Sequence, residues 1–280
     1  MLEVKFPLQK QINEDTWIRF EKPATDGGRV DGISLHFGCI YILKGKNGSG
    51  KTTLLNLISA LTDCPAQFVQ RDSDIVFMAT DSSIHPLNKA ALRESYFSYV
   101  FQDPHIINTY SVEENLRLVN SLFDPARDIP ALNQQIAQDP RISSESGKYL
   151  QEKLDKFYIE RRLSPYALSG GEKQLLAFIR AMIKPGRIVV ADEPWASMDE
   201  IAKHFVEEQL ARYTQGQDVF APIRSRQNQA AGPNTVLVIT HDTHRLAAEE
   251  KGSWEIPTTY RTAGDAWNRS LSLECHAVCG

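Results

Sequence analysis

The chain has no hydrophobic run long enough to cross a membrane. Its two most apolar uncharged stretches, residues 32–43 and 52–62, are shorter than the roughly 18 apolar residues that a spanning helix needs. Residues 1–5 lack the apolar segment of a secretion signal. We therefore expect a cytoplasmic protein that reaches a membrane only through a partner.

The sequence also lacks an excess of basic charge and has few cysteines. The 31 Lys and Arg residues are balanced by 35 Asp and Glu, and the formal net charge of −4 does not favour nucleic acid as a partner. Cys275, His276 and Cys279 lack a second pair of ligands, which disfavours a zinc site. With 280 residues, 42% of them hydrophobic, the chain can bury a sizeable core.

The most informative motif of the chain is a glycine-rich stretch. It lies between a predicted apolar strand, residues 39–43, and a predicted apolar helix. This phosphate loop reads Gly45, Lys46, Asn47, Gly48, Ser49, Gly50, Lys51, Thr52 and Thr53. Glycines allow backbone N–H groups to point at phosphate oxygens, and the helix that begins near Lys51 adds its positive dipole end. Lys51 supplies a charge for the β- and γ-phosphates, and the Thr52 hydroxyl can ligate Mg²⁺. The pattern predicts a nucleoside-triphosphate site.

Two carboxylates end a second apolar strand, residues 188–191. Asp192 is expected to reach Mg²⁺, and Glu193 to polarise the water that attacks the γ-phosphate. By itself the Asp-Glu pair is also typical of a capped turn between a strand and a helix.

Residues 168–174, Leu-Ser-Gly-Gly-Glu-Lys-Gln, resemble the signature motif of ATP-binding-cassette (ABC) ATPases. Residues 101–103 resemble the Q-loop of that family, residues 197–199 its D-loop and residues 238–242 its H-loop. The resemblance extends from about residue 14 to residue 250. It implies that Gln102 ligates Mg²⁺ or water and that His241 contacts the γ-phosphate beside Glu193. It also implies that Asp199 senses the opposite site of a dimer.

The signature residues Ser169, Gly170 and Gly171 precede a helix and so form a second anion site. In the family, this loop binds the γ-phosphate of the nucleotide held by the opposing subunit. The resemblance therefore implies a head-to-tail dimer around two Mg-ATP. For adenine stacking, Trp17 and Phe20 are the candidate aromatic residues, although a core or surface role fits each of them equally well.

The expected fold is α/β: a P-loop NTPase core with a mixed sheet flanked by helices, an antiparallel β edge and a helical subdomain that carries the signature motif. We expect a single domain, residues 1–280, with the ATPase core at about 1–100 and 186–250 and the helical subdomain at about 103–182. Residues 15–20 alternate like an edge strand, and residues 214–234 read as a surface loop that could face a partner. The tail, residues 252–280, shows little periodicity and receives no role.

Two functions remain open. The first is the ATPase subunit of a membrane transporter, similar to cassettes that work with lipoprotein-release or macrolide-export permeases. The second is a soluble ABC ATPase in DNA maintenance, translation or defence. The span of 118 residues from Lys51 to Ser169 holds no sustained heptads, which disfavours the chromosome-maintenance type. A small-molecule kinase is disfavoured by the signature loop. The substrate, the direction of transport, the permease and the choice between a homodimer and a heterodimer do not follow from the sequence.

Overall fold

The computed structural model describes the chain except residues 26, 73, 80–82, 84, 141, 143, 160, 161, 163, 226–232, 241–248, 263–265 and 278–280. The described residues form two compact units. Unit 1 contains residues 1–97, 237–240 and 249–277, and unit 2 contains residues 98–236. In the part of the chain that is described, no helix has both the length and the apolar character to span a bilayer.

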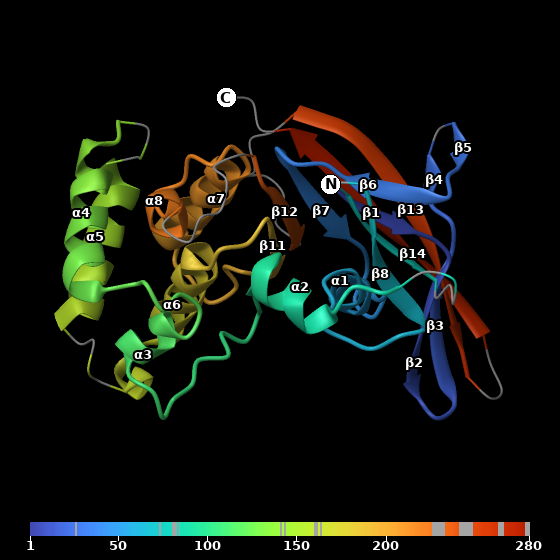
Figure 1. Cartoon of the computed structure of the whole chain (residues 1–280), viewed down its shortest axis with the longest axis horizontal. Coiled ribbons are helices and arrows are strands. Elements are labelled where there is room, and N and C mark those ends of the chain that lie inside the picture. The colour runs from blue at the N-terminus through green and yellow to red at the C-terminus, as the bar shows by residue number, and fades with distance from the viewer. Residues whose placement is uncertain are drawn as a thin grey trace. The chain divides into compact units, whose positions relative to one another are not determined.

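Unit 1 contains two sheets. The smaller sheet has the order β6-β1-β9-β8, from Gly32–Leu35, Leu2–Lys5, Asp74–Ala79 and Ala66–Arg71. The larger sheet has the consecutive strands β7-β14-β13-β3-β2, from Cys39–Lys44, Ala266–Ala277, Glu249–Arg261, Thr16–Phe20 and Leu8–Asn13 (Figure 1). The short strands β4 (Ala24–Thr25) and β5 (Gly28–Arg29) and the helices α1 (Lys51–Ile58) and α2 (Lys89–Ser95) complete the unit.

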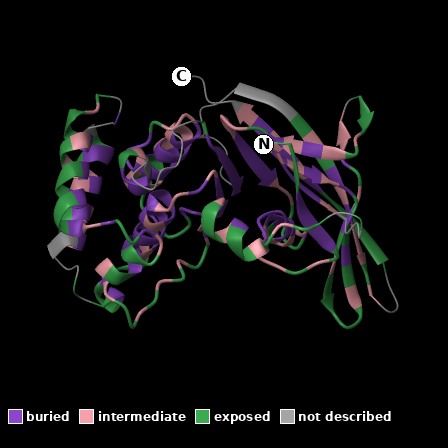
Figure 2. Cartoon of the chain, viewed as in Figure 1, coloured by how far each residue is buried: buried purple, intermediate pink, exposed green. Residues whose placement is uncertain are grey.

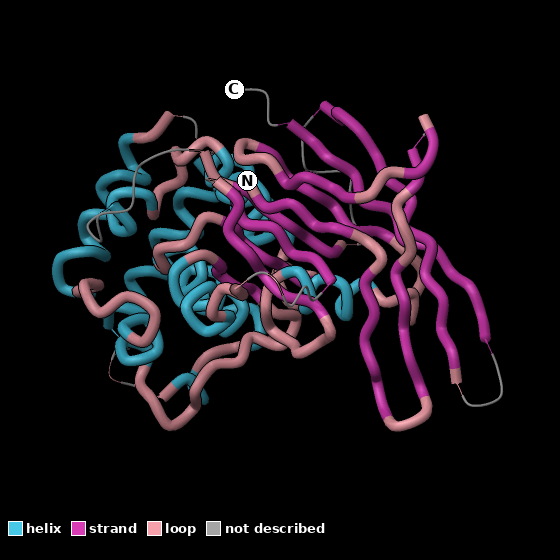
Figure 3. The backbone as a smooth tube through the Cα atoms, turned by 45° about the vertical axis from the view of Figure 1, so that its right-hand side comes forward, coloured by secondary structure: helices cyan, strands magenta, loops and turns pink. Residues whose placement is uncertain are grey.

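The segment that received no role from the sequence is a long antiparallel hairpin in this sheet (Figure 3). Strand β14 pairs with β7, which leads into the phosphate loop, and β13 pairs with β3. Leu271, Leu273 and Cys275 are buried at alternate positions, and Ser272 and Glu274 lie between them. This is the period of a strand with one face in a core, so the hairpin is a structural part of unit 1.

The interpretation of residues 15–20 as an edge strand is wrong in one respect. β3 is a strand, but it lies between β13 and β2. The outer strand β2, with the sequence Leu-Gln-Lys-Gln-Ile-Asn, is mostly polar and exposed, which conceals it from a search for apolar alternation. Polar, charged outer strands are typical because they discourage pairing with another chain.

Unit 2 contains β11 (Ile188–Asp192), flanked in the sheet by β10 (Phe97–Val100) and β12 (Thr235–Ile239), which lie at the unit boundaries. Its helices are α3 (Val112–Arg117), α4 (Pro125–Gln138), α5 (Ser144–Ile159), α6 (Gly170–Ile183), α7 (Glu200–Thr214) and α8 (Ala221–Ser225), with the 3₁₀ turn η1 (Pro165–Ala167). α5 packs against both α4 and α7. Figure 2 shows α4 and α5 with one buried and one exposed face.

Residues 214–234 were expected to form a surface loop, and for their described first half this is wrong. Val219, Phe220 and Ile223 are buried in unit 2. Arg224 is also buried and forms an ion pair with Asp218, while its guanidinium donates to the carbonyl of Met182 at 2.6 Å. The Gln, Asn, Gly and Pro content of the segment suggested a surface loop, but its apolar residues and its ion pair are buried, and paired charges can be buried when each satisfies the other. Residues 226–232 lie outside the described residues.

Candidate nucleotide site

The phosphate loop connects β7 to α1 in unit 1. Gly48 and Gly50 have positive φ angles of 70° and 94°, a conformation that favours glycine. Gly50 caps α1 without a side chain, and the first turn of that helix has no acidic residue. The first N–H groups of a helix need partners that its own backbone cannot supply. The N-terminus of α1 is therefore suited to an anion.

Lys51 and Ser49 are both held inside the loop. The ammonium of Lys51 donates to the carbonyls of Gly45 at 2.8 Å and Lys46 at 3.3 Å. Ser49 is completely buried, and its Oγ has no hydrogen-bond partner among the described residues. A buried hydroxyl without a partner is costly. A phosphate oxygen in the loop would satisfy both the hydroxyl and the lysine.

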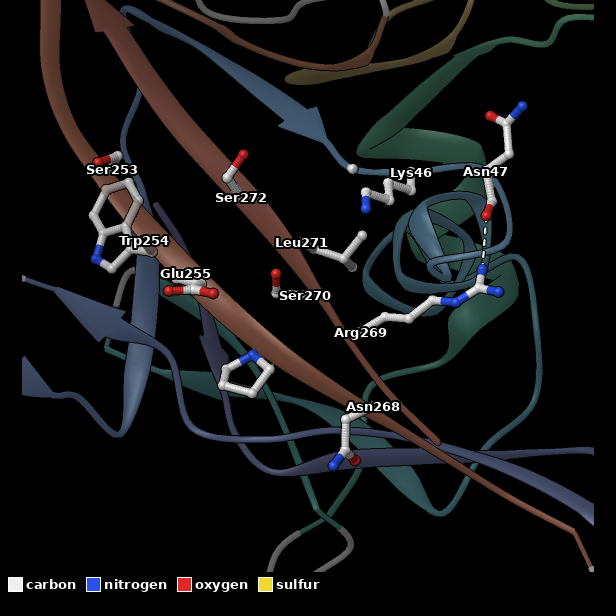
Figure 4. Close-up of a pocket in the computed structure, with 12 residues that line it drawn as sticks. Lys46, Asn47, Ser253, Trp254, Glu255, Asn268, Arg269, Ser270, Leu271 and Ser272 are labelled. Carbon is white, nitrogen blue, oxygen red and sulfur yellow. Dashed lines mark hydrogen bonds between the residues drawn. The ribbon is translucent and has the colours of Figure 1, made fainter. Parts of the chain in front are cut away.

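A pocket of about 950 Å³ opens beside the first half of the loop (Figure 4). Gly45, Lys46 and Asn47 line it on one side, and residues of β13 and β14 line it on the other. Figure 4 shows Glu255, Asn268 and Arg269 among the polar side chains of the hairpin. The phosphate loop therefore borders an open space within unit 1 that has both polar and apolar lining.

The signature residues begin α6 in unit 2. Ser169 is the N-cap and forms a capping box with Glu172: its Oγ accepts from the Glu172 N–H at 3.2 Å, and the Glu172 carboxylate accepts from the Ser169 N–H at 3.0 Å. A capping box fixes the direction in which a helix starts. The capping box therefore fixes the position of the signature residues 169–171 at the start of α6.

The sequence predicts no separate role for Glu172 within the signature motif, but in the structure its carboxylate organises the start of α6. Its buried carboxylate also accepts from the ammonium groups of Lys153 at 3.0 Å and Lys156 at 2.8 Å. Burial opposes its charge, but the hydrogen bonds from Lys156, the Ser169 N–H and Lys153 lower its pKa to about 2. The carboxylate is therefore ionised at neutral pH.

Gly171 allows the signature helix to approach the D-loop. A Cβ at this position would lie 3.0 Å from the carbonyl oxygen of Ser197, whereas a Cβ on Gly170 would meet nothing within 4 Å. The D-loop itself is anchored by Trp195 and Met198, which are both buried. Its Asp199 caps α7 by accepting from the Ala202 N–H at 2.8 Å, and its sensing role across a dimer stays a prediction.

Asp192 ends β11, and Glu193 follows it with a positive φ of 44°. Such a conformation is uncommon and unfavourable for a residue with a Cβ, and it is frequent at functional sites. Both carboxylates are half-buried. The chain turns immediately afterwards, where the Ala196 N–H donates to the Glu193 carbonyl at 3.2 Å.

Gln102 is exposed in a loop that two side chains of α6 hold from both ends. Gln174 donates to the carbonyl of Phe101 at 2.9 Å and to that of Pro194 at 3.1 Å. Arg180 donates to the carbonyl of Pro104 at 3.2 Å. Gln174 thus joins the Q-loop to the segment after Glu193, a connection between distant residues that local sequence patterns do not reveal.

The expected site residues divide between the two units. Unit 1 holds Gly45 to Thr53, and unit 2 holds Gln102, Ser169–Gly171, Asp192, Glu193 and Asp199. His241 lies outside the described residues. Of the two candidates for adenine stacking, Phe20 is completely buried and offers no face to a base, while Trp17 is 36% exposed. Among the described residues no group of three or more His, Cys, Asp or Glu is arranged to hold a metal.

Comparison with known proteins places this site in a family. The ABC transporter family model matches residues 31–196, more than half of the chain. A protein of Staphylococcus epidermidis named for hemin import, HrtA, is 30% identical over 209 residues, which cover 73% of this chain and 77% of that protein. The macrolide export ATP-binding/permease protein MacB of Hyphomonas neptunium is 28% identical over 89% of this chain, which spans only 33% of MacB.

A solved dimeric structure of the ATP-binding cassette MJ0796 with ADP and phosphate covers 86% of this chain and 87% of its own, at 20% identity and a TM-score of 0.49. The matched family segment includes the phosphate loop, the Q-loop, the signature motif and the Asp192-Glu193 pair. The chain belongs to the ABC transporter family and is an ATP-binding, ATP-hydrolysing subunit of that family.

Proposed function

We propose that two copies of this chain close head-to-tail over two Mg-ATP and thereby drive a membrane permease. The observation that carries the proposal is the presence on one chain of two separate helix starts that carry the phosphate-contacting motifs of the family. One is the phosphate loop before α1, and the other is Ser169–Gly171 at the start of α6. A role for the start of α6 follows if it binds the γ-phosphate of a nucleotide that the other subunit holds.

In the proposed cycle, the loop N–H groups and Lys51 bind the phosphates. Glu193 accepts a proton from the water that attacks the γ-phosphorus in line, with His241 as its orienting partner. Hydrolysis removes the phosphate that bridges the subunits, so the dimer opens. Opening and closing is the mechanical output, because the γ-phosphate biases a two-state element.

The proposed cycle includes a magnesium ion, and the types of donor atom on three of the expected residues suit it. Thr52, Gln102 and Asp192 supply a hydroxyl, an amide and a carboxylate oxygen, which are the hard ligands that Mg²⁺ prefers. When bound, Mg²⁺ would neutralise charge on the β- and γ-phosphates. In the proposed cycle the chain supplies these oxygens, and Glu193 acts as the base.

The permease is proposed to dock on unit 2 around α3. Large apolar side chains are exposed there, and this docking surface comprises Ile107, Tyr110, Leu118, Leu122 and Tyr166. The loop before α3 is rigid, because the buried amide of Asn115 bonds the N–H and carbonyl of Ile107, both at 3.0 Å. Exposed apolar side chains on and near a fixed loop suit a protein partner. The chain would then lie at the inner membrane face through its partner.

Affinity capture tests the proposal. Tagged Glu193→Gln protein, purified with ATP from gently solubilised cells, is expected to carry a membrane protein in stoichiometric amount. Leu118→Ser should lose that protein, whereas Ile12→Ser should keep it, because Leu118 and Ile12 are similarly exposed at 50% and 48% but lie in different units. Recovery of a soluble dimer alone, or of one bound to ribosomes or nucleic acid, would contradict the transport proposal.

A further inference from the structure

The β13–β14 hairpin contacts the phosphate loop through two side chains. The hydroxyl of Tyr260 on β13 donates to the carbonyl of Gly48 at 2.7 Å. The guanidinium of Arg269 on β14 donates to the carbonyl of Asn47 at 2.7 Å, the bond drawn in Figure 4. The hairpin lies outside residues 31–196, the segment that the family model matches. Two successive peptide groups of the loop are therefore bonded to one distant element.

These bonds determine where the loop N–H groups point. In a trans peptide the C=O and N–H groups lie on opposite sides of the bond. With the Asn47 carbonyl turned toward Arg269, the N–H of Gly48 is directed away from the hairpin. With the Gly48 carbonyl turned toward Tyr260, the N–H of Ser49 is likewise directed away, where it meets the Lys46 carbonyl at 3.1 Å. The Gly48 N–H is thus turned away from the hairpin before a ligand arrives, while the Ser49 N–H is engaged by the loop's own backbone.

The two anchoring side chains are themselves held in place. The ring of Tyr260 stacks on Trp267, with centroids 5.5 Å apart and an interplanar angle of 5°, and the Arg269 guanidinium lies 5.9 Å from the Tyr260 centroid. Arg269 can approach because position 48 is glycine: a Cβ there would lie 2.7 Å from its Nη1. The contact of Arg269 with the loop is therefore supported by the Tyr260–Trp267 stack and by the absence of a side chain at Gly48.

We propose that Tyr260 and Arg269 are positioning residues for nucleotide binding, which hold the Asn47–Gly48 segment in the conformation that receives phosphate. Because the hairpin preorganises the loop, the conformational entropy of the loop is already reduced in the free protein and is not lost when the nucleotide binds. Without the two bonds, the glycine-rich segment samples other orientations, and ATP and ADP must select one of them.

The test compares Tyr260→Phe, which keeps the stacked ring, Arg269→Gln and the double variant with wild type. Arg261→Gln is the matched control, since it removes an exposed arginine from the position next to Tyr260 on β13. We expect the Kd of ATP and of ADP to rise about fivefold in each single variant and more in the double variant. KM for ATP should rise in parallel, while kcat at saturating ATP stays within about twofold. Arg269→Lys, which retains a cationic donor, should recover part of the affinity.

Two further readouts separate positioning from simple support of the hairpin. In the nucleotide-free protein, the amides of Gly48 and Ser49 should exchange hydrogen faster in the double variant, while the midpoint of thermal unfolding changes little. If the midpoint falls and the Kd of ATP and of ADP matches that of Arg261→Gln, the residues support the hairpin alone and the proposal is overturned. The proposal would also be overturned if the double variant and wild type had equal Kd values for ATP and ADP and equal hydrogen exchange rates at Gly48 and Ser49.

Discussion

Replacing Glu172 by Gln tests how the signature helix is held. The carboxylate has 7% of its surface exposed and accepts hydrogen bonds from Lys153, Lys156 and the Ser169 N–H. Glutamine preserves the shape and a carbonyl oxygen for the capping box, but it removes the charge that the two lysines face. The change therefore isolates the buried ionic interaction at the start of α6.

The magnitude follows from the pKa of the carboxyl group. Its hydrogen bonds lower that pKa from 4.5 to about 2 against the opposing effect of burial. At about 1.4 kcal/mol for each pH unit, this corresponds to about 3 kcal/mol of stability at neutral pH. The lysines are 26% and 34% exposed, and solvent screening reduces the expected loss to about 2 kcal/mol. Because the folded-state pKa is lowered, the contribution is fully present above pH 4.5 and is lost as the pH falls toward 2.

The assay is denaturant unfolding of wild type and Glu172→Gln at several pH values between 7 and 3. The matched control is Glu113→Gln, which breaks an exposed pair with Arg117 on α3 and should cost less than about 0.5 kcal/mol. The difference between wild type and Glu172→Gln should shrink below pH 4.5. A loss no larger than that of Glu113→Gln, or one that stays constant down to pH 3, would refute the reasoning.

Three further outcomes are expected. Glu193→Gln should bind ATP with unchanged affinity but release phosphate at least about 100-fold more slowly, and near-normal turnover would remove it as the base. Lys51→Ala should weaken ATP binding by about 10-fold or more in equilibrium titration, because Lys51 is the buried lysine of the loop and its ammonium would face the phosphates. Gly171→Ala should lower the unfolding midpoint, since its Cβ would lie 3.0 Å from the Ser197 carbonyl oxygen, while Gly170→Ala should leave it unchanged or raise it. Equal midpoints for the two glycine variants would show that the D-loop moves aside freely.

The sequence predicted those parts of the fold whose signal is local. The helix that follows Ser169 and the strand of residues 188–191 were confirmed, because apolar runs are read directly from neighbouring residues. The phosphate loop was also confirmed in its place between β7 and α1. The family assignment was confirmed by the match over residues 31–196.

The structural features that the sequence did not predict depend on contacts between residues far apart in the chain. Gln174 resembles any polar helix residue until its amide is found against Phe101 and Pro194, 73 and 20 positions away. Tyr260 meets Gly48 across 212 positions. For the hairpin, a usable signal existed in the alternation of Leu271, Leu273 and Cys275 with polar residues, but its place beside the phosphate loop depends on pairing with the distant strand β7.

The direct test of the proposed cycle is the mass of Glu193→Gln in solution, measured by light scattering with and without Mg-ATP. We predict the 31.5 kDa chain alone and twice that mass with ATP, with dimerisation abolished when Ser169→Arg is added. A mass that stays at 31.5 kDa under saturating ATP, or a dimer that persists with Ser169→Arg, would contradict the head-to-tail closure on which the account depends.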